Sequence, residues 1–241
     1  MKEIKILHIF PKLLCLYGEY ANISVLKHYL EKNSFTVTIT DCEEPLPPLN
    51  DFDMIYMGSG TEDNILHAIT LLYPYKEAIQ KSIEGGRLWL ITGNAQAIFG
   101  RCITYEDGRH CNALDIFPFT VTCTRKRFSG DVLSSAFAGK ALIGYINNSY
   151  IFEGITSPLT RLTLNPCLGN NKITGDEGLL FKSFYSTALT GPLLIKNPHF
   201  LEFFMEAITD SRLIIPENEP IKKAYASSLR QLKKRSSSSA D

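Results

Sequence analysis

The chain has 241 residues, of which 44% are hydrophobic, and its 25 Lys and Arg residues balance its 25 Asp and Glu residues. That length and hydrophobic content are enough for a full buried core, so we expect a single domain over residues 1–215. The zero net charge gives no global field that would attract nucleic acid or an anionic membrane, which excludes nucleic-acid partners. Residues 216–241 are basic and Ser-rich, and we expect a partly disordered tail there.

The cysteines indicate a reducing compartment. They are scattered without a CxxC pair, which is typical of free cytosolic thiols rather than of a disulfide framework or a zinc site. No stretch approaches the roughly 18 apolar residues of a membrane span, and the amino terminus enters a strand without a signal peptide. We therefore expect a cytoplasmic protein without membrane insertion, metal or cofactor.

Strands and helices alternate over the first hundred residues. Apolar and β-branched runs predict strands at 4–10, 35–40, 51–57 and 88–91, and helical spacing predicts helices at 21–33 and 62–84. Such strands, buried on both faces, are typical of a parallel sheet covered on two sides. The pattern predicts an α/β fold with a doubly wound, mostly parallel sheet flanked by helices.

After Gly100 the sequence changes to short strands separated by Gly, Asn and Pro turns. We expect strands at 117–123, 141–146, 159–164 and 179–184, and a closing helix at 197–208. These strands predict an antiparallel extension within the same domain.

Two glycine loops follow apolar strands, where parallel sheets place their ligand crevice. Gly58-Ser59-Gly60 lacks a Walker or GxGxxG pattern and leads into acidic residues, so phosphate binding is poorly supported, and the loop is either an ordinary turn or a ligand-facing nest. The second loop, from Gly93 to Gly100, has the strand–turn–helix layout of a nucleophile elbow. The residue at its turn is glycine, which has no side chain to offer.

Several segments in unbroken order carry a resemblance. They are IFPKLLCLYGEYANI at 9–23 with Pro11, Tyr17, Gly18 and Asn22, the loop at 58–62, the elbow at 93–100, GPLL at 191–194 and KNP at 196–198. Over roughly residues 3–208 the chain resembles class I glutamine amidotransferases of the cobyric acid synthase type, most closely the glutaminase subunit of lipid II isoglutaminyl synthase. That family implies a flavodoxin-like fold, glutamine as substrate, a Mur-ligase-like partner and a role in amidating lipid II for cell-wall peptidoglycan.

The catalytic positions of that family are changed here. Glutamine hydrolysis needs a cysteine thiolate, a histidine that exchanges protons and backbone amides that hold the oxyanion. The resemblance places Gly93 at the cysteine position, Thr190 at the catalytic histidine and Asn148 at a second family histidine. We expect an inactive pseudo-glutaminase that serves as a binding or partner subunit for glutamine or another small amide or amino acid.

The ligand-binding candidates are Gly58, Ser59, Gly60, Asn94 and Arg127. The resemblance matches Arg127 to a family arginine near the glutamine pocket, where it would bind a carboxylate. A solvated basic loop is the alternative interpretation, and the sequence supports it equally. Asn94 either bonds a ligand or simply suits a tight turn.

An active enzyme is the main alternative. In it, Cys102 or a partner-supplied group would replace the missing nucleophile, and ammonia would pass to a Mur-ligase-like or cobyric-acid-type synthase. A different reaction that uses Thr92, Asn94, Glu62 or Asp63 as a base is a further alternative. The sequence leaves open the ligand, the choice between a cell-wall and a cobalamin-type pathway, and the oligomeric state.

Overall fold

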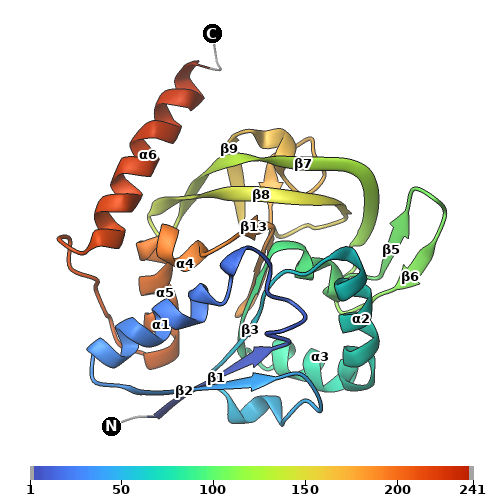
Figure 1. The fold of residues 1–241 in the computed structure, drawn as a ribbon, viewed down its shortest axis with the longest axis horizontal. Helices are drawn as coiled ribbons and strands as arrows, with labels where there is room; N and C mark the ends of the chain where they lie inside the picture. Colours follow the sequence, from blue (N-terminus) through green and yellow to red (C-terminus); the bar gives the residue numbers. More distant parts are fainter. Residues whose placement is uncertain (1–2, 239–241) are drawn as a thin grey trace.

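A six-stranded sheet forms the centre of the computed structural model, which describes residues 3–238 (Figure 1). Its order is β11-β12-β4-β3-β1-β2, and every neighbouring pair is parallel except β11 with β12. The strands are β1 (Glu3–Ile9), β2 (Thr36–Cys42), β3 (Met54–Met57), β4 (Leu88–Thr92), β11 (Leu179–Phe181) and β12 (Phe184–Thr187). The order of the five parallel strands is that of doubly wound, flavodoxin-like sheets, which confirms the predicted fold class.

Helices cover both faces of this sheet, because successive strand residues point to opposite sides. Ile55 and Trp89 belong to the core on the side of α2 and α3, and Tyr56 and Leu90 belong to the core on the side of α1 and α5. The helices are α1 (Ala21–Lys32), α2 (Glu62–Leu72), α3 (Lys76–Glu84), α4 (Leu193–Lys196) and α5 (Pro198–Thr209). Among residues 3–238, no helix combines the length and apolar character that crossing a membrane requires.

The single helix expected over 62–84 is divided in two. A 3-10 turn at Tyr73–Tyr75 separates α2 from α3. Pro74 lies in this turn, and proline lacks the amide hydrogen that would continue an α-helix. The prediction of one continuous helix was therefore wrong at this proline.

A second, mostly antiparallel sheet lies beside the first and confirms the expected extension (Figure 1). Its two long strands, β7 and β8, pair over most of their lengths, with register shifts between Cys123 and Phe128 and between Leu133 and Ala136. Such irregularities bend a strand. The strands are β5 (Cys102–Tyr105), β6 (His110–Asn112), β7 (Thr120–Phe137), β8 (Lys140–Glu153), β9 (Thr160–Leu164), β10 (Asp176–Glu177) and β13 (Leu189–Thr190).

Helix α6 (Pro220–Ser238) occupies most of the stretch for which we expected a partly disordered tail, and residues 239–241 lie outside the described part of the chain. Tyr225, Leu229 and Leu232 are spaced three and four residues apart, so they share one face, and that face packs beside β7, β8 and β9. The helix carries no acidic residue. Its basic residues are Lys222, Lys223, Arg230, Lys233, Lys234 and Arg235.

Candidate functional site

The elbow at the end of β4 has the backbone of a sharp strand-to-helix turn. Gly93 has a φ of 66°, in the left-handed region that favours glycine, and it begins a 3-10 helix at Gly93–Phe99. Any side chain at this position would be held under backbone strain, as nucleophiles of such elbows are.

The space into which such a side chain would project is already filled. A Cβ built on Gly93 would overlap the Cβ of Ser59, would lie 2.5 Å from its Oγ and would lie 3.4 Å from Oε1 of Glu19. Ser59 and Glu19 are both buried. Because the neighbours are a short side chain and a fully enclosed carboxylate, a residue larger than glycine requires Ser59 to move.

Glu19 is fixed in this position by groups from three distant segments. Its carboxylate accepts hydrogen bonds from the backbone N–H of Ser59, from the Thr92 hydroxyl (3.2 Å) and from the backbone N–H of Gly191 (3.3 Å). Burial raises the pKa of Glu19 to about 7, although these hydrogen bonds oppose the rise. The Glu19 carboxylate thus occupies the backbone N–H of Ser59, a loop amide of the kind that stabilises the oxyanion in acyl transfer.

Sequence reasoning missed Glu19, although a signal was present. Glu19 is the only acidic residue in the segment at 9–23 on which the resemblance rests. Its role depends on contacts with Ser59, Thr92 and Gly191, which no local pattern encodes.

The segments that carry the resemblance meet in space. Nδ2 of Asn22 donates to the hydroxyl of Tyr56 (3.0 Å) and to the carbonyl of Gly191 (3.4 Å), and its Oδ1 accepts from the backbone of Leu194 (2.9 Å). The Tyr56 hydroxyl in turn donates to the carbonyl of Glu19 (3.0 Å). This buried network joins the amino-terminal segment to the GPLL motif.

A cavity of about 310 Å³ lies beside the filled position. Most of the site residues predicted from the sequence line it, namely Ser59, Gly60, Asn94, Arg127, Asn148 and Thr190. Neither Gly58 nor Gly93 does, and a Cβ on Gly58 would lie 2.7 Å from the carbonyl oxygen of Leu14. Gly58 therefore allows close packing of the backbone below the cavity.

Asn94 and Thr190 shape the wall of the cavity through bonds within the protein. Asn94 accepts from the backbone N–H of Gly60 (3.1 Å) and donates to its carbonyl (2.8 Å). The Thr190 hydroxyl donates to the carbonyl of Tyr145 (3.1 Å). Both side chains are thus already engaged in holding loop and strand in place.

One buried polar atom of the cavity lining lacks a hydrogen-bond partner among the described residues. It is Nδ2 of Asn148, a residue that is 3% exposed, whereas the hydroxyl of Ser59, a residue 1% exposed, interacts with the carboxylate of Glu19. Leaving a group such as Nδ2 of Asn148 unpaired costs about 1–3 kcal/mol, so this amide is available to bond a ligand or water. Within residues 3–238, the one hydrogen bond of the Arg127 side chain goes to the amide oxygen of Asn147, at a long 3.4 Å, and Asn147 donates to the hydroxyl of Tyr17.

Neither Cys102 nor Cys123 lines the cavity. Cys102 begins β5. Cys123 lines a neighbouring cleft, where burial raises its pKa to about 11, so that it is a neutral thiol near pH 7. Within residues 3–238, no group of three or more His, Cys, Asp or Glu side chains could hold a metal ion.

Comparison with known proteins shows similarity to glutamine amidotransferases. No family model matches the chain. It is 24% identical to the GatD subunit of lipid II isoglutaminyl synthase (glutamine-hydrolyzing) from Staphylococcus aureus strain N315 over 207 residues, which cover 86% of this chain and 84% of that one. The Streptococcus pneumoniae GatD is 23% identical over 205 residues, covering 81% and 76%.

Solved structures show the same fold at low identity. A glutamine amidotransferase superposes with a TM-score of 0.53 at 12% identity over 84% of this chain and 98% of that one. A Thermotoga maritima glutamine amidotransferase gives 0.52 at 12% identity over 98% and 99%. The overall fold is therefore shared with these proteins.

Proposed function

Because the chain is a homologue of GatD subunits and has the fold of glutamine amidotransferases, we propose that it is an inactive glutaminase relative that binds a small ligand and acts as a partner subunit. The observation that carries this proposal is the filled space above Gly93. An acyl-enzyme needs a sulfur atom there, and the side chains of Ser59 and Glu19 take that volume instead.

The surrounding groups support the same conclusion. Thr190, at the position that the resemblance assigns to the catalytic histidine, has a hydroxyl that does not titrate near neutral pH and that already donates to Tyr145. The backbone amide of Ser59, which could stabilise an oxyanion, is bonded to the carboxylate of Glu19. Nucleophile, base and one oxyanion donor are thus all absent or occupied.

The ligand that fits the cavity is glutamine or a similar amino acid. A volume of about 310 Å³ holds one amino acid, and its lining is polar. The unpaired Nδ2 of Asn148 would donate to a carboxamide or carbonyl oxygen, and the guanidinium of Arg127 would bond a carboxylate. The carboxylates of Glu62 and Asp63 would accept an ammonium group.

We propose a Mur-ligase-like protein as the partner, because both curated relatives are named as subunits of lipid II isoglutaminyl synthase. In this role the chain would regulate or scaffold its partner rather than supply ammonia. A cobyric-acid-type synthase is the corresponding partner in the alternative pathway.

Ammonia release from glutamine tests the proposed inactivity. The purified chain, alone and mixed with a Mur-ligase-like protein, is expected to give no turnover above a heat-treated sample, while calorimetry detects glutamine binding. An active GatD subunit serves as the positive control. Turnover that persists through purification would contradict the proposal, and its loss in Cys102→Ala would establish the displaced nucleophile.

A further inference from the structure

A second cleft, of about 370 Å³, lies beside the first cavity. We call it the arginine cleft, because Arg109, Arg125 and Arg127 all line it. The linings of the two hollows share Glu62, Arg127 and Ser149. They therefore form one polar groove, with Ser59 and the unpaired amide of Asn148 toward one end, Arg127 at the junction, and Arg109 and Arg125 toward the other end.

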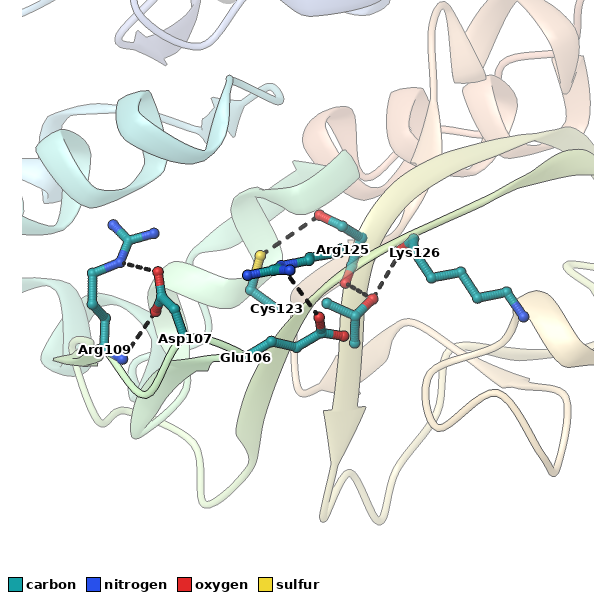
Figure 2. Close-up of polar contacts among 8 residues, drawn as sticks. Glu106, Asp107, Arg109, Cys123, Arg125 and Lys126 are labelled. Atoms are coloured by element: carbon teal, nitrogen blue, oxygen red, sulfur yellow. Dashed lines mark hydrogen bonds and ion pairs between the residues drawn. The ribbon is translucent and has the colours of Figure 1, made fainter.

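Arg109 is held in place by its neighbours, whereas Arg125, whose side chain is 86% exposed, lies near one carboxylate (Figure 2). Nε of Arg109 pairs with Asp107 (2.8 Å), and its guanidinium lies 4.5 Å from the ring centroid of Tyr105. Nε of Arg125 lies 3.9 Å from Glu106. The shortest contact of each ion pair uses Nε, while Asp63 acts on Arg109 and Asp107 acts on Arg125 at longer range. The Nη groups, which form the fork that bonds carboxylates, are thus left for a ligand.

Tyr105 lines the arginine cleft and is 7% exposed. Its hydroxyl interacts with that of Tyr150, and neither hydroxyl has another hydrogen-bond partner among the described residues. In a pair of hydroxyls only one O–H donates to the other, so the second O–H remains available to a polar ligand.

The charges around the arginine cleft constrain the ligand. Its arginines face three carboxylates in the same lining, those of Glu62, Glu106 and Asp107, so the cleft as a whole is neutral. A polyanion would meet these carboxylates, whereas a molecule with one carboxylate and one ammonium group finds a partner for each.

We propose that the groove binds a dipeptide-like molecule, with its first residue in the first cavity and its terminal carboxylate on Arg109 and Arg125. This inference rests on the proposed function, because it extends the ligand of the same cavity. The ammonium group lies near Glu62 and Asp63, the peptide carbonyl passes Arg127 at the junction, and the carboxylate reaches the arginine cleft. A free amino acid fills only half of this groove.

Calorimetry on the full chain with three probes tests the proposal: L-glutamine, glutaminyl-glycine, and glutaminyl-glycine amide, which lacks the terminal carboxylate. Because charge-assisted hydrogen bonds are involved, we expect the dipeptide to bind on the order of tenfold more tightly than its amide. Arg109→Gln and Arg125→Gln should each reduce this preference to about twofold. Arg101→Gln is the matched control, since Arg101 pairs with Asp115 outside both hollows and should retain the full preference.

The outcomes separate this inference from the proposed function. If glutamine binds but the dipeptide and its amide bind equally, the arginine cleft is not a subsite and the first cavity stands. A preference that survives both arginine substitutions also overturns the proposal. If none of the probes binds, ligand binding in the first cavity fails together with its extension. Circular dichroism of each variant verifies that the fold is intact.

Discussion

Gly93 and Ser59 compete for one volume, because a Cβ on Gly93 would overlap the Ser59 side chain. We predict that Gly93→Cys lowers the free energy of unfolding by about 2–4 kcal/mol, through overpacking and left-handed strain. Adding Ser59→Gly should recover the overpacking part. Denaturant titration in reducing buffer measures both variants.

Gly86 supplies the matched control for this prediction. Its φ is also positive, at 80°, but a Cβ there meets nothing within 4 Å. Gly86→Cys therefore reports strain alone and should cost about 1 kcal/mol. Equal losses for Gly93→Cys and Gly86→Cys would show that Ser59 moves aside without cost.

Glu19 makes stability depend on pH. Its folded pKa, raised from 4.5 to about 7 by burial, lies above the unfolded value, so the folded state binds the proton more tightly. Stability is therefore fully present below about pH 4.5 and falls as the pH rises to 7, by on the order of 3 kcal/mol. Glu19→Gln, which stays uncharged, should flatten the dependence measured by denaturant unfolding from pH 5 to 8.

The buried Glu177 provides the background for this experiment. Burial raises the pKa of Glu177 to about 7 as well, so the free energy of unfolding of Glu19→Gln should still fall with rising pH, with a smaller slope. Parallel pH curves for the original chain and Glu19→Gln would mean that the Glu19 carboxylate has an ordinary pKa. In that case the hydrogen bonds from Ser59 and Gly191, which lower the pKa of Glu19, offset the rise in pKa that desolvation causes.

The attachment of helix α6 to the second sheet depends on a small apolar contact. Tyr225 donates a hydrogen bond to the carbonyl of Ala141 (2.7 Å), and its ring lies 5.2 Å from that of His199, whose pKa burial lowers to about 4. We predict that Tyr225→Ala lowers the free energy of unfolding by about 3 kcal/mol and speeds amide exchange along α6. Denaturant titration and hydrogen exchange provide the measurements.

The exposed Lys223 on the same helix is the control for this change. Lys223→Ala should leave both stability and exchange almost unchanged, because it removes no packing. If Tyr225→Ala accelerates exchange nowhere in α6, the helix is held by its ion pairs, such as that of Arg235 with Asp131, rather than by its apolar face.

Elements that bury all their residues were the easiest to predict from the sequence. Every residue of β4 is buried, and its continuous apolar run indicates a central strand. Strand β7 has an irregular burial pattern, with exposed and buried runs in its middle, and was predicted at less than half of its length. Helix α6 was missed because lysine and serine dominate its composition, although Tyr225, Leu229 and Leu232 already had helical spacing.

Across the whole molecule, the chain order of the motifs was enough to predict the flavodoxin-like fold, and solved glutamine amidotransferases share it. The assignment of Gly93, Thr190 and Asn148 to former catalytic positions stays a prediction. The filling of the elbow could not be predicted from the sequence, because Glu19 is separated from its partner Gly191 by most of the chain.

The charge of α6 has a consequence for the molecule in solution. All charged residues of the helix are basic, and the helix lies at one edge of the fold, while the chain as a whole is neutral (Figure 1). The remaining residues therefore carry an equal excess of negative charge, and the protein has a permanent electric dipole. At low ionic strength, this dipole orients an approaching negatively charged molecule toward the helix before contact. Salt near 0.1 M screens the interaction beyond a distance of about 10 Å.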